Sequence, residues 1–575
     1  MMPLPGVVRP RRGVIWLLHA LGVLVAALYL FLVMTRGDAW FALNDPAGRV
    51  FDEGVELNAA ARVLAGEVPY RDFALIYAPG QAYTLAAVFR LFGQSMAVER
   101  AYDLVVRLLL CISVYLLART VVSSKAALAP FALATILLAS AYYYAYTMYP
   151  ALLFGLLSAT VCLGFVRAPS PRRLFAAGLL AGIATIYRHD VGLYVLVSEV
   201  ALLVLWAWAV RPTPSPAESV PRPHVERFVR SAWPLLAGLG TTLAPIALYL
   251  LAVVPLADLW YAFVAFPLTD FRSAFALPYP EPAAPFTALA SSTASRGDAL
   301  AEFAFGYPDV VWALFWTQPL IDAAGLLWVG VALYRRRQRP AELTSVWGIA
   351  LVTLLAIAFF NQALNRADTL HLLPSGILSC LVLTGLASRA LAAPQLRAPA
   401  AVALLLAGLV MAPAYVWWPL VTAHDALQWG EMAPCGMGAD LARADCVFIF
   451  PDQADAIRFV QQRTAPHEAI FVGNAVHDRI VPNDALFYFV ADRPNATRFD
   501  DLVSGLVSTA RTQSGIIADL QRNQVRWVVL SAMNQDQVEP NAMGRPTGVT
   551  LLDDYIGRNY AQVQQFGSYT IWQRR

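Results

Sequence analysis

The chain has 575 residues, of which 58% are hydrophobic and only 14% are charged. Soluble proteins carry about 25% charged residues, and one hydrophobic core stops growing at about 250–300 residues, so the composition argues against an ordinary soluble protein. The net charge is +3, and no basic tract with interleaved aromatic residues is present, which argues against a nucleic-acid partner. Apolar blocks of bilayer-spanning length recur as far as residue 420 and then stop.

The chain is therefore predicted to be a polytopic α-helical membrane protein with about 11 transmembrane helices. Residues 14–34 follow a basic N-terminal segment and form an apolar run too long for a signal peptide. Residues 79–93 are short for a span, and we expect a re-entrant or interfacial helix there. The predicted spans are approximately 14–34, 101–120, 127–146, 150–166, 174–187, 191–210, 232–254, 308–333, 343–361, 371–388 and 399–420.

Arginine clusters set the predicted direction of these spans. If 79–93 does not cross, clusters such as Arg172-Arg173 and Arg335-Arg336 all fall in cytoplasmic loops, as the positive-inside rule requires. If 79–93 did cross, every cluster would move to the wrong side. The sequence therefore predicts a multi-pass protein of the cell (inner) membrane with a cytoplasmic N-terminus and an extracytoplasmic C-terminal domain.

The region from residue 421 to 575 has a different pattern of apolar and polar residues, which is typical of a small α/β domain. Helical patterns alternate with short apolar or alternating segments that are typical of strands. The predicted helices are 452–464 and 513–523, and the predicted strands are 468–473, 526–531 and 566–573. The histidines and carboxylates here are scattered, so we expect no separate catalytic centre in residues 421–575.

The five cysteines divide between the two parts of the chain. Cys111, Cys162 and Cys380 lie inside apolar blocks and are expected to be small buried hydrophobic residues. Cys435 and Cys446 both follow the last span, and an extracytoplasmic location would permit a disulfide between them. Their spacing alone does not decide whether the bond forms.

The loop after the first span, residues 36–78, is called the first loop here and carries the densest polar signal. Asp52 and Glu53 are adjacent carboxylates just beyond a span, which suits a site that accepts a proton or holds a cation. A phosphate leaving group also needs cationic or hydrogen-bonding groups, and arginine grips phosphate with two hydrogen bonds. The candidates for substrate binding in this loop are Glu53, Tyr70, Arg71, Asp72 and Tyr77. The alternative is that the acidic pair only caps a surface helix.

Two further polar clusters interrupt apolar sequence on the same predicted side of the membrane. Ionisable groups at membrane depth are costly and usually functional. The alternative is that each arginine and aspartate form a local ion pair that anchors a helix end. Because all three clusters fall on one face, we predict a shared substrate site. The candidates here are Arg188, His189 and Asp190 in one cluster and Arg366, Asp368 and His371 in the other.

Residues 51–107 resemble the start of GT-C glycosyltransferases, the group that includes protein O-mannosyltransferases, lipid A aminoarabinose transferases and related bacterial family 39 enzymes. The resemblance lies in the pair Asp52-Glu53, the helix end Ala61 to Gly66, the proline-led helix 79–93 that ends in Phe-Gly, and Arg100. It implies that Asp52 is the general base and that the donor is a polyprenyl-phosphate sugar. It leaves open whether a divalent cation is used.

The predicted function is transfer of a sugar from a polyprenyl-phosphate donor in the membrane to an extracytoplasmic glycan, lipid or protein. The main alternative is a polytopic transporter or lipid flippase, although such proteins place ionisable groups near the bilayer centre and often contain repeats. A membrane-anchored assembly protein is a second alternative, and a polymer ligase or polymerase using the same lipid carriers also stays open.

Overall fold

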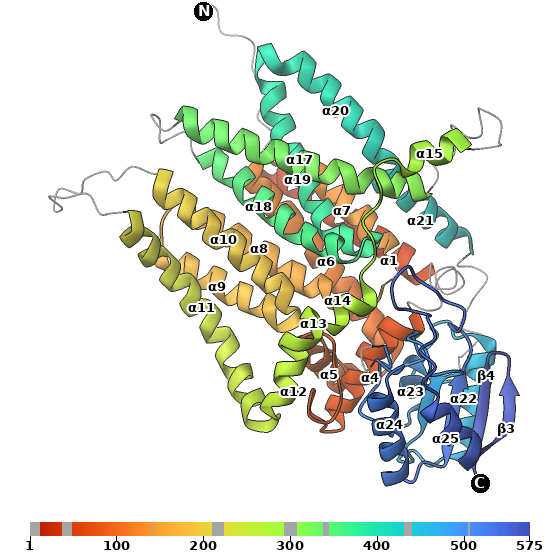
Figure 1. The fold of residues 1–575 in the computed structure, drawn as a ribbon. Coiled ribbons are helices and arrows are strands. Elements are labelled where there is room, and N and C mark those ends of the chain that lie inside the picture. Colours follow the sequence, from red (N-terminus) through yellow and green to blue (C-terminus); the bar gives the residue numbers. More distant parts are fainter. Residues whose placement is uncertain are drawn as a thin grey trace, which may run out of the picture.

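The protein is seen in a computed structural model that describes residues 12–36, 49–141, 143–209, 224–291, 307–336, 344–429, 440–503 and 506–575. A bundle of long helices is joined at one end to a smaller domain that contains a four-stranded sheet (Figure 1). Within these residues nine helices are long and apolar enough to cross a membrane. The predicted fold class, a polytopic helical membrane protein with a C-terminal α/β domain, is confirmed.

The predicted spans all coincide with helices. Apolar segments of this length form helices in lipid because a helix satisfies every backbone hydrogen bond internally. Two of the helices are shorter than the rest, α7 (Leu128–Ser140) and α9 (Pro171–Tyr187). The longer ones are α1 (Arg12–Arg36), α6 (Met96–Val121), α8 (Met148–Arg167), α10 (His189–Ala209), α11 (His224–Val253), α17 (Tyr307–Arg336), α18 (Thr344–Asn365), α19 (Thr369–Ala392), and α20 (Arg397–Ala412), which continues through η5 (Pro413–Trp417) into α21 (Trp418–Trp429).

The two ends of the bundle differ in what they carry. The C-terminal ends of α10 and α17 lie at the end remote from the sheet domain (Figure 1). The chain between α9 and α10 and the turn between α18 and α19 lie at the opposite end, close to that domain. The polar clusters that the sequence singles out therefore share one end of the bundle.

Helix α5 (Gly80–Phe92) has 13 residues and is the segment predicted not to cross the membrane. At 1.5 Å per residue it is about 20 Å long, which is less than the roughly 30 Å of a hydrocarbon core. It packs against α4 (Gly54–Leu64) and α6. The first loop thus enters the bundle end as the π-helical turn η1 (Arg49–Glu53) followed by two short helices.

A second group of short helices follows α11 and lies at the same end of the bundle (Figure 1). Together they make a broken, aromatic-rich segment, of which residues between Phe266 and Ala276 form one wall of the candidate site. They are α12 (Leu256–Trp260), η2 (Tyr261–Ala265), α13 (Phe266–Leu268), α14 (Asp270–Phe275) and α15 (Ala284–Ser291).

The C-terminal domain has a sheet of order β1-β2-β4-β3, in which β1 and β2 are parallel and β4 is antiparallel to both of its neighbours. The strand predicted at 566–573 is largely β4, and its first residues form the turn after β3, where Gly567 has φ of +50°. The elements are α22 (Pro451–Arg463), β1 (Phe471–Asn474), α23 (Leu486–Ala491), α24 (Ala510–Arg522), β2 (Trp527–Ser531), α25 (Leu551–Asn559), β3 (Tyr560–Phe566) and β4 (Tyr569–Arg574).

The C-terminal domain shares a hydrophobic core with the first loop. Leu57 of α4 and Phe89 of α5 pack with Leu486 and Phe489 of α23, and the two phenylalanine rings stack with centroids 5.6 Å apart. A Cβ added to Gly54 would lie 2.7 Å from the Cα of Leu486, so glycine permits this close approach. Asp52 lies two residues before Gly54, so its position depends on the contact between α4 and the C-terminal domain.

Among the described cysteines, Cys111, Cys162 and Cys380 are buried and free, as predicted. Cys446 is disulfide-bonded. Cys435, the partner that the sequence left open, lies outside the described residues.

Candidate functional site

Glu53 fixes the start of the first loop on helix α6. Its carboxylate is fully buried and accepts two hydrogen bonds from the Arg100 guanidinium, at 2.7 and 3.0 Å. The same guanidinium lies 3.2 Å from the ring centroid of Tyr144. Arg100 is also the arginine of the family resemblance, so this part of the motif has a visible structural role. Asp52, the neighbouring carboxylate, is only half-buried.

Glu56 lies one helical turn after Asp52 and forms a second acidic group that the sequence analysis did not single out. Burial, reinforced by repulsion from Asp52 and opposed by attraction to Arg188, raises the pKa of Glu56 to about 8. Burial also raises the pKa of Tyr77 to about 12, with Arg188 opposing and Asp52 reinforcing the shift. These pKa shifts show that four side chains lie within electrostatic reach of one another, namely Asp52, Glu56, Tyr77 and Arg188. The available signal was the four-residue spacing, which puts two side chains on one helix face.

Arg188 occupies the break between α9 and α10 and is almost completely buried. It donates to both carboxylate oxygens of Asp190, at 3.1 and 2.9 Å, and to the hydroxyl of Tyr146 at 3.1 Å. Its guanidinium also lies 4.3 Å from the ring centroid of Tyr77. Asp190 accepts a further hydrogen bond of 2.8 Å from the Gln362 amide. The predicted arginine–aspartate pair is thus a neutralised unit that ties α10 to α18 and the first loop.

Arg366 and Asp368 organise the turn between α18 and α19. Asp368 caps α19 by accepting hydrogen bonds from the backbone N–H of His371 at 2.9 Å and from its Nδ1 at 2.7 Å. Arg366 donates to Asp368 at 2.9 Å and to the backbone carbonyl of Phe275 at 2.9 Å. It also donates twice to Glu539 of the C-terminal domain, at 2.9 and 2.6 Å. This turn therefore contacts both the aromatic-rich segment and the C-terminal domain.

A cavity of about 340 Å³ joins the second and third clusters to the end of the first loop. Six of the predicted residues line it: Tyr77, Arg188, His189, Asp190, Arg366 and His371. The segment from Phe266 to Phe271 supplies an apolar wall, while Asn361, Gln362 and Asn365 of α18 supply amides. The cavity is therefore apolar on one side and polar on the other.

Two polar atoms of the cavity lining are buried without a partner. Among the described residues, neither the His189 Nδ1 nor the Gln362 Oε1 has a hydrogen-bond partner. Buried polar atoms in native proteins are nearly always hydrogen-bonded. Their presence in one cavity is expected if a ligand supplies the missing groups.

Arg272, which the sequence analysis did not single out, is an exposed residue of α14 at the edge of this cavity. Within the described parts of the chain its guanidinium makes no ion pair or hydrogen bond. Arg188 and Arg366, by contrast, are each bound to carboxylates. Among the described residues Arg272 is therefore an uncompensated cation at the cavity. No sequence pattern identifies it, because it lies in a short helix whose bulkiest other residues are aromatic.

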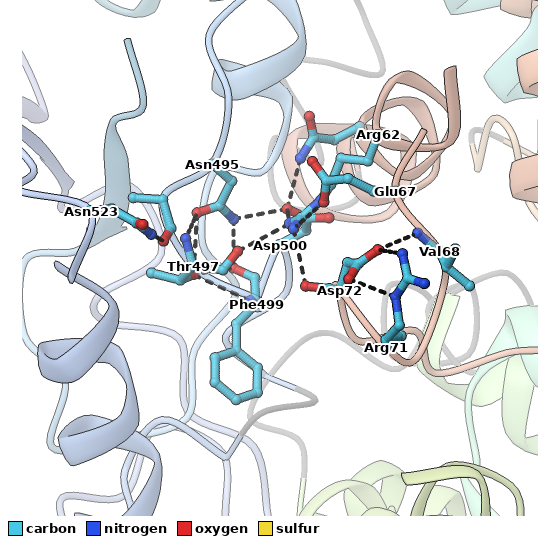
Figure 2. Close-up of polar contacts among 12 residues, drawn as sticks. Arg62, Glu67, Val68, Arg71, Asp72, Asn495, Thr497, Phe499, Asp500 and Asn523 are labelled. Atoms are coloured by element: carbon cyan, nitrogen blue, oxygen red, sulfur yellow. Dashed lines mark hydrogen bonds and ion pairs between the residues drawn. The ribbon is translucent and has the colours of Figure 1, made fainter. Parts of the chain in front are cut away.

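Five predicted residues of the first loop do not line the cavity. The Tyr70 hydroxyl donates to the backbone carbonyl of Tyr77 at 2.7 Å, so it shapes the loop. Arg71 is partly exposed and pairs with Asp72 at 2.7 Å, beside the contact of the loop with the C-terminal domain (Figure 2). Asp52 and Asp368 adjoin lining residues without being part of the lining themselves. Glu53 also lies outside the lining and is bound to Arg100.

The described residues contain no group of three or more His, Cys, Asp or Glu side chains placed to hold a metal ion. The carboxylates around the cavity are instead engaged with arginine, histidine or amide groups. Use of a divalent cation stays an open question of the sequence analysis.

The chain is similar to two proteins of known structure. Apo ArnT from Cupriavidus metallidurans is 14% identical over 98% of this chain and 98% of that one, with a TM-score of 0.49. The apo oligosaccharyltransferase of Archaeoglobus fulgidus is 14% identical over 89% of this chain and 69% of that one, also with a TM-score of 0.49. ArnT bound to undecaprenyl phosphate matches with the same identity and TM-score over 96% of this chain and 97% of that one.

No protein-family model matches the chain, and no curated protein matches it. At 14% identity the likeness lies in the course of the backbone rather than in shared side chains.

Proposed function

We propose that the chain is a membrane glycosyltransferase that moves a sugar from a polyprenyl-phosphate donor to an acceptor at the end of the bundle carrying the C-terminal domain. The observation that carries this proposal is the cavity, which combines an apolar wall with polar atoms and an arginine that have no partner among the described residues. Its lining residue Tyr77 lies within electrostatic reach of Asp52. A lipid-linked phosphate sugar has the matching parts: an apolar chain, an anion and hydroxyl groups.

Each part of the donor has a candidate contact. The lipid chain would lie along the apolar wall that includes Phe266 and Phe271. The phosphate would bind Arg272, since arginine can give two hydrogen bonds to a phosphate and this one has no carboxylate partner within the described residues. The sugar hydroxyls would meet the unpartnered atoms of His189 and Gln362, which would satisfy both sides.

The proposed chemistry is a single displacement at the anomeric carbon. The acceptor hydroxyl oxygen forms a bond to that carbon as the bond to the phosphate oxygen breaks, and the electron pair leaves with the phosphate. Asp52 accepts the proton of the acceptor hydroxyl. Glu56, protonated at neutral pH because its pKa is raised to about 8, adds no second negative charge beside Asp52 during this step. Glu53 supports the base by anchoring the loop through Arg100.

The test is sugar transfer by purified full-length protein from a panel of radiolabelled polyprenyl-phosphate sugars to membrane acceptors. Asp52→Asn is nearly isosteric and should reduce transfer by about a hundred- to ten-thousand-fold, the usual effect of removing a general base. Asp72→Asn is the matched control, because it removes a carboxylate of the same loop that pairs with Arg71, whereas Asp52 lies within electrostatic reach of the lining residue Tyr77.

Wild-type transfer by Asp52→Asn would remove Asp52 from the mechanism. Movement of the lipid between leaflets, without transfer of its sugar to any acceptor, would instead favour a flippase.

A further inference from the structure

The C-terminal domain contributes a charged residue to the edge of the cavity. Glu539 lies in the segment between β2 and α25. Its two carboxylate oxygens accept hydrogen bonds from Arg366 at 2.6 and 2.9 Å. The Asn541 amide donates to the same carboxylate at 2.7 Å. The backbone N–H of Gly544 donates to the Ile480 carbonyl at 2.9 Å, which fixes this segment on the domain.

The ion pair is flanked by a hydrophobic cluster built from both parts of the chain. Phe266 and Phe275 of the aromatic-rich segment pack with Ile480, Val503 and Met543 of the C-terminal domain. Partly buried side chains next to Asp52 and Tyr77 pack on the same cluster, namely Phe51 and Ile76. The side chains of Glu539 and Arg366 are themselves only 16% and 19% exposed. Screening by water is therefore reduced at this contact.

The contact changes the charge that the cavity offers to an anion. Arg366 is held by two carboxylates, Glu539 and Asp368, so its positive charge is more than balanced locally. Arg272 is left as the uncompensated guanidinium of the cavity lining among the described residues. Without Glu539, Arg366 would face the cavity with one carboxylate fewer.

We propose that Glu539 of the C-terminal domain lowers the affinity of the cavity for a lipid phosphate by engaging Arg366. The lipid phosphate left after sugar transfer then binds one guanidinium rather than two, and it dissociates more readily. This inference rests on the proposed function, because it concerns the phosphate of the same donor. Glu539 acts through Arg366 and is a positioning residue rather than a catalytic one.

The experiment measures equilibrium binding of undecaprenyl phosphate to the purified full chain by native mass spectrometry. Glu539→Gln keeps the size of the side chain and removes its charge, and it should tighten binding by about three- to tenfold, as expected for one charge at several ångströms in a partly screened site. Asp536→Asn is the matched control, since it removes an exposed carboxylate from the same segment and should leave binding within about twofold. Adding Arg366→Gln to Glu539→Gln should abolish the gain.

The outcomes separate the two proposals. Tighter binding in Glu539→Gln that is lost in the double variant supports the inference, whether or not loss of the ion pair lowers the melting temperature. A purely structural role for Glu539 would weaken binding and lower the melting temperature, and that result overturns the inference. Equal affinity in wild type and Glu539→Gln also overturns it while leaving the proposed function intact. If the wild-type chain does not bind the lipid phosphate, the proposed function fails and the inference fails with it.

Discussion

Arg62 joins helix α4 to the C-terminal domain, and its replacement should loosen that contact far more than replacement of a neighbouring arginine. The Arg62 guanidinium pairs with Asp500 at 2.8 Å and with Glu67 at 2.7 Å (Figure 2). Arg71 of the same loop pairs with Asp72 at 2.7 Å. The two ion pairs have similar lengths but differ in burial, which makes Arg62→Met and Arg71→Met a matched comparison.

The magnitudes follow from exposure. The side chains of Arg62 and Asp500 are 9% and 1% exposed, so Arg62→Met leaves a buried carboxylate without its cation. Breaking a buried pair in this way costs about 3–5 kcal/mol. The side chains of Arg71 and Asp72 are 43% and 31% exposed, and such a surface pair contributes at most about 1 kcal/mol. The difference in the free energy of unfolding should therefore be at least about 2 kcal/mol.

The assay is thermal unfolding of the full chain in detergent, combined with the protease resistance of the C-terminal domain. Arg62→Met should lower both, whereas Arg71→Met should stay near wild type. Asp500→Asn added to Arg62→Met should recover part of the loss, because it removes the unpaired charge. Equal effects of the two arginine variants, or no recovery in the double variant, would refute the argument that burial of this pair holds the domain in place.

Two further predictions concern residues next to Asp52. Because the pKa of Glu56 is raised from 4.5 to about 8, the folded protein holds an extra proton in that range and its stability should fall as pH rises through it. Melting temperatures of wild type and Glu56→Gln measured across the range should fall more steeply with pH in wild type than in the variant. Gly54→Ala should destabilise the protein, since its Cβ would meet the backbone of α23, whereas Gly515→Ala, with nothing within 4 Å, should stabilise α24 by about 0.5–1 kcal/mol. Equal unfolding temperatures for the two alanine variants would contradict the close contact.

The helices of the bundle could be predicted from the sequence because an apolar run of sufficient length has few alternatives in lipid. Short segments were harder. The predicted strand 566–573 merges part of β3 with β4, since Phe566 and Tyr569 pair across a two-residue turn and the alternation of side chains continues through it. The helix α7, with 13 residues, is shorter than the span expected at 127–146. In both places the pattern of apolar residues continues along the chain, although the strand or helix ends before the pattern does.

The candidate site was predictable where a single helix end carries its own polar residues. The clusters at 188–190 and 366–371 are of this kind, and both contribute to the lining of one cavity. Glu539 could not be found this way, because its contact with Arg366 joins residues 173 positions apart in the chain. Arg272 lies in a segment whose aromatic residues suggest only packing. Their roles depend on the tertiary arrangement rather than on any local pattern.

The arginines show why residue type alone does not identify an anion site. Arg71, Arg188 and Arg366 are equally cationic in the sequence, yet each is bound to at least one carboxylate. The field at the cavity follows the sum of these charges, so a neutralised arginine contributes oriented hydrogen-bond donors and little net attraction.

Such an arrangement suits an enzyme whose lipid phosphate must leave after each turnover. Several uncompensated guanidiniums would bind substrate and product phosphate alike, and uniform binding does not accelerate the chemical step. Within the described residues, one free guanidinium at the cavity, with the other arginines held by carboxylates, would combine recognition of the donor with release of the product. If this reasoning is right, the affinity for the lipid phosphate is set as much by Asp190, Asp368 and Glu539 as by the arginines they hold.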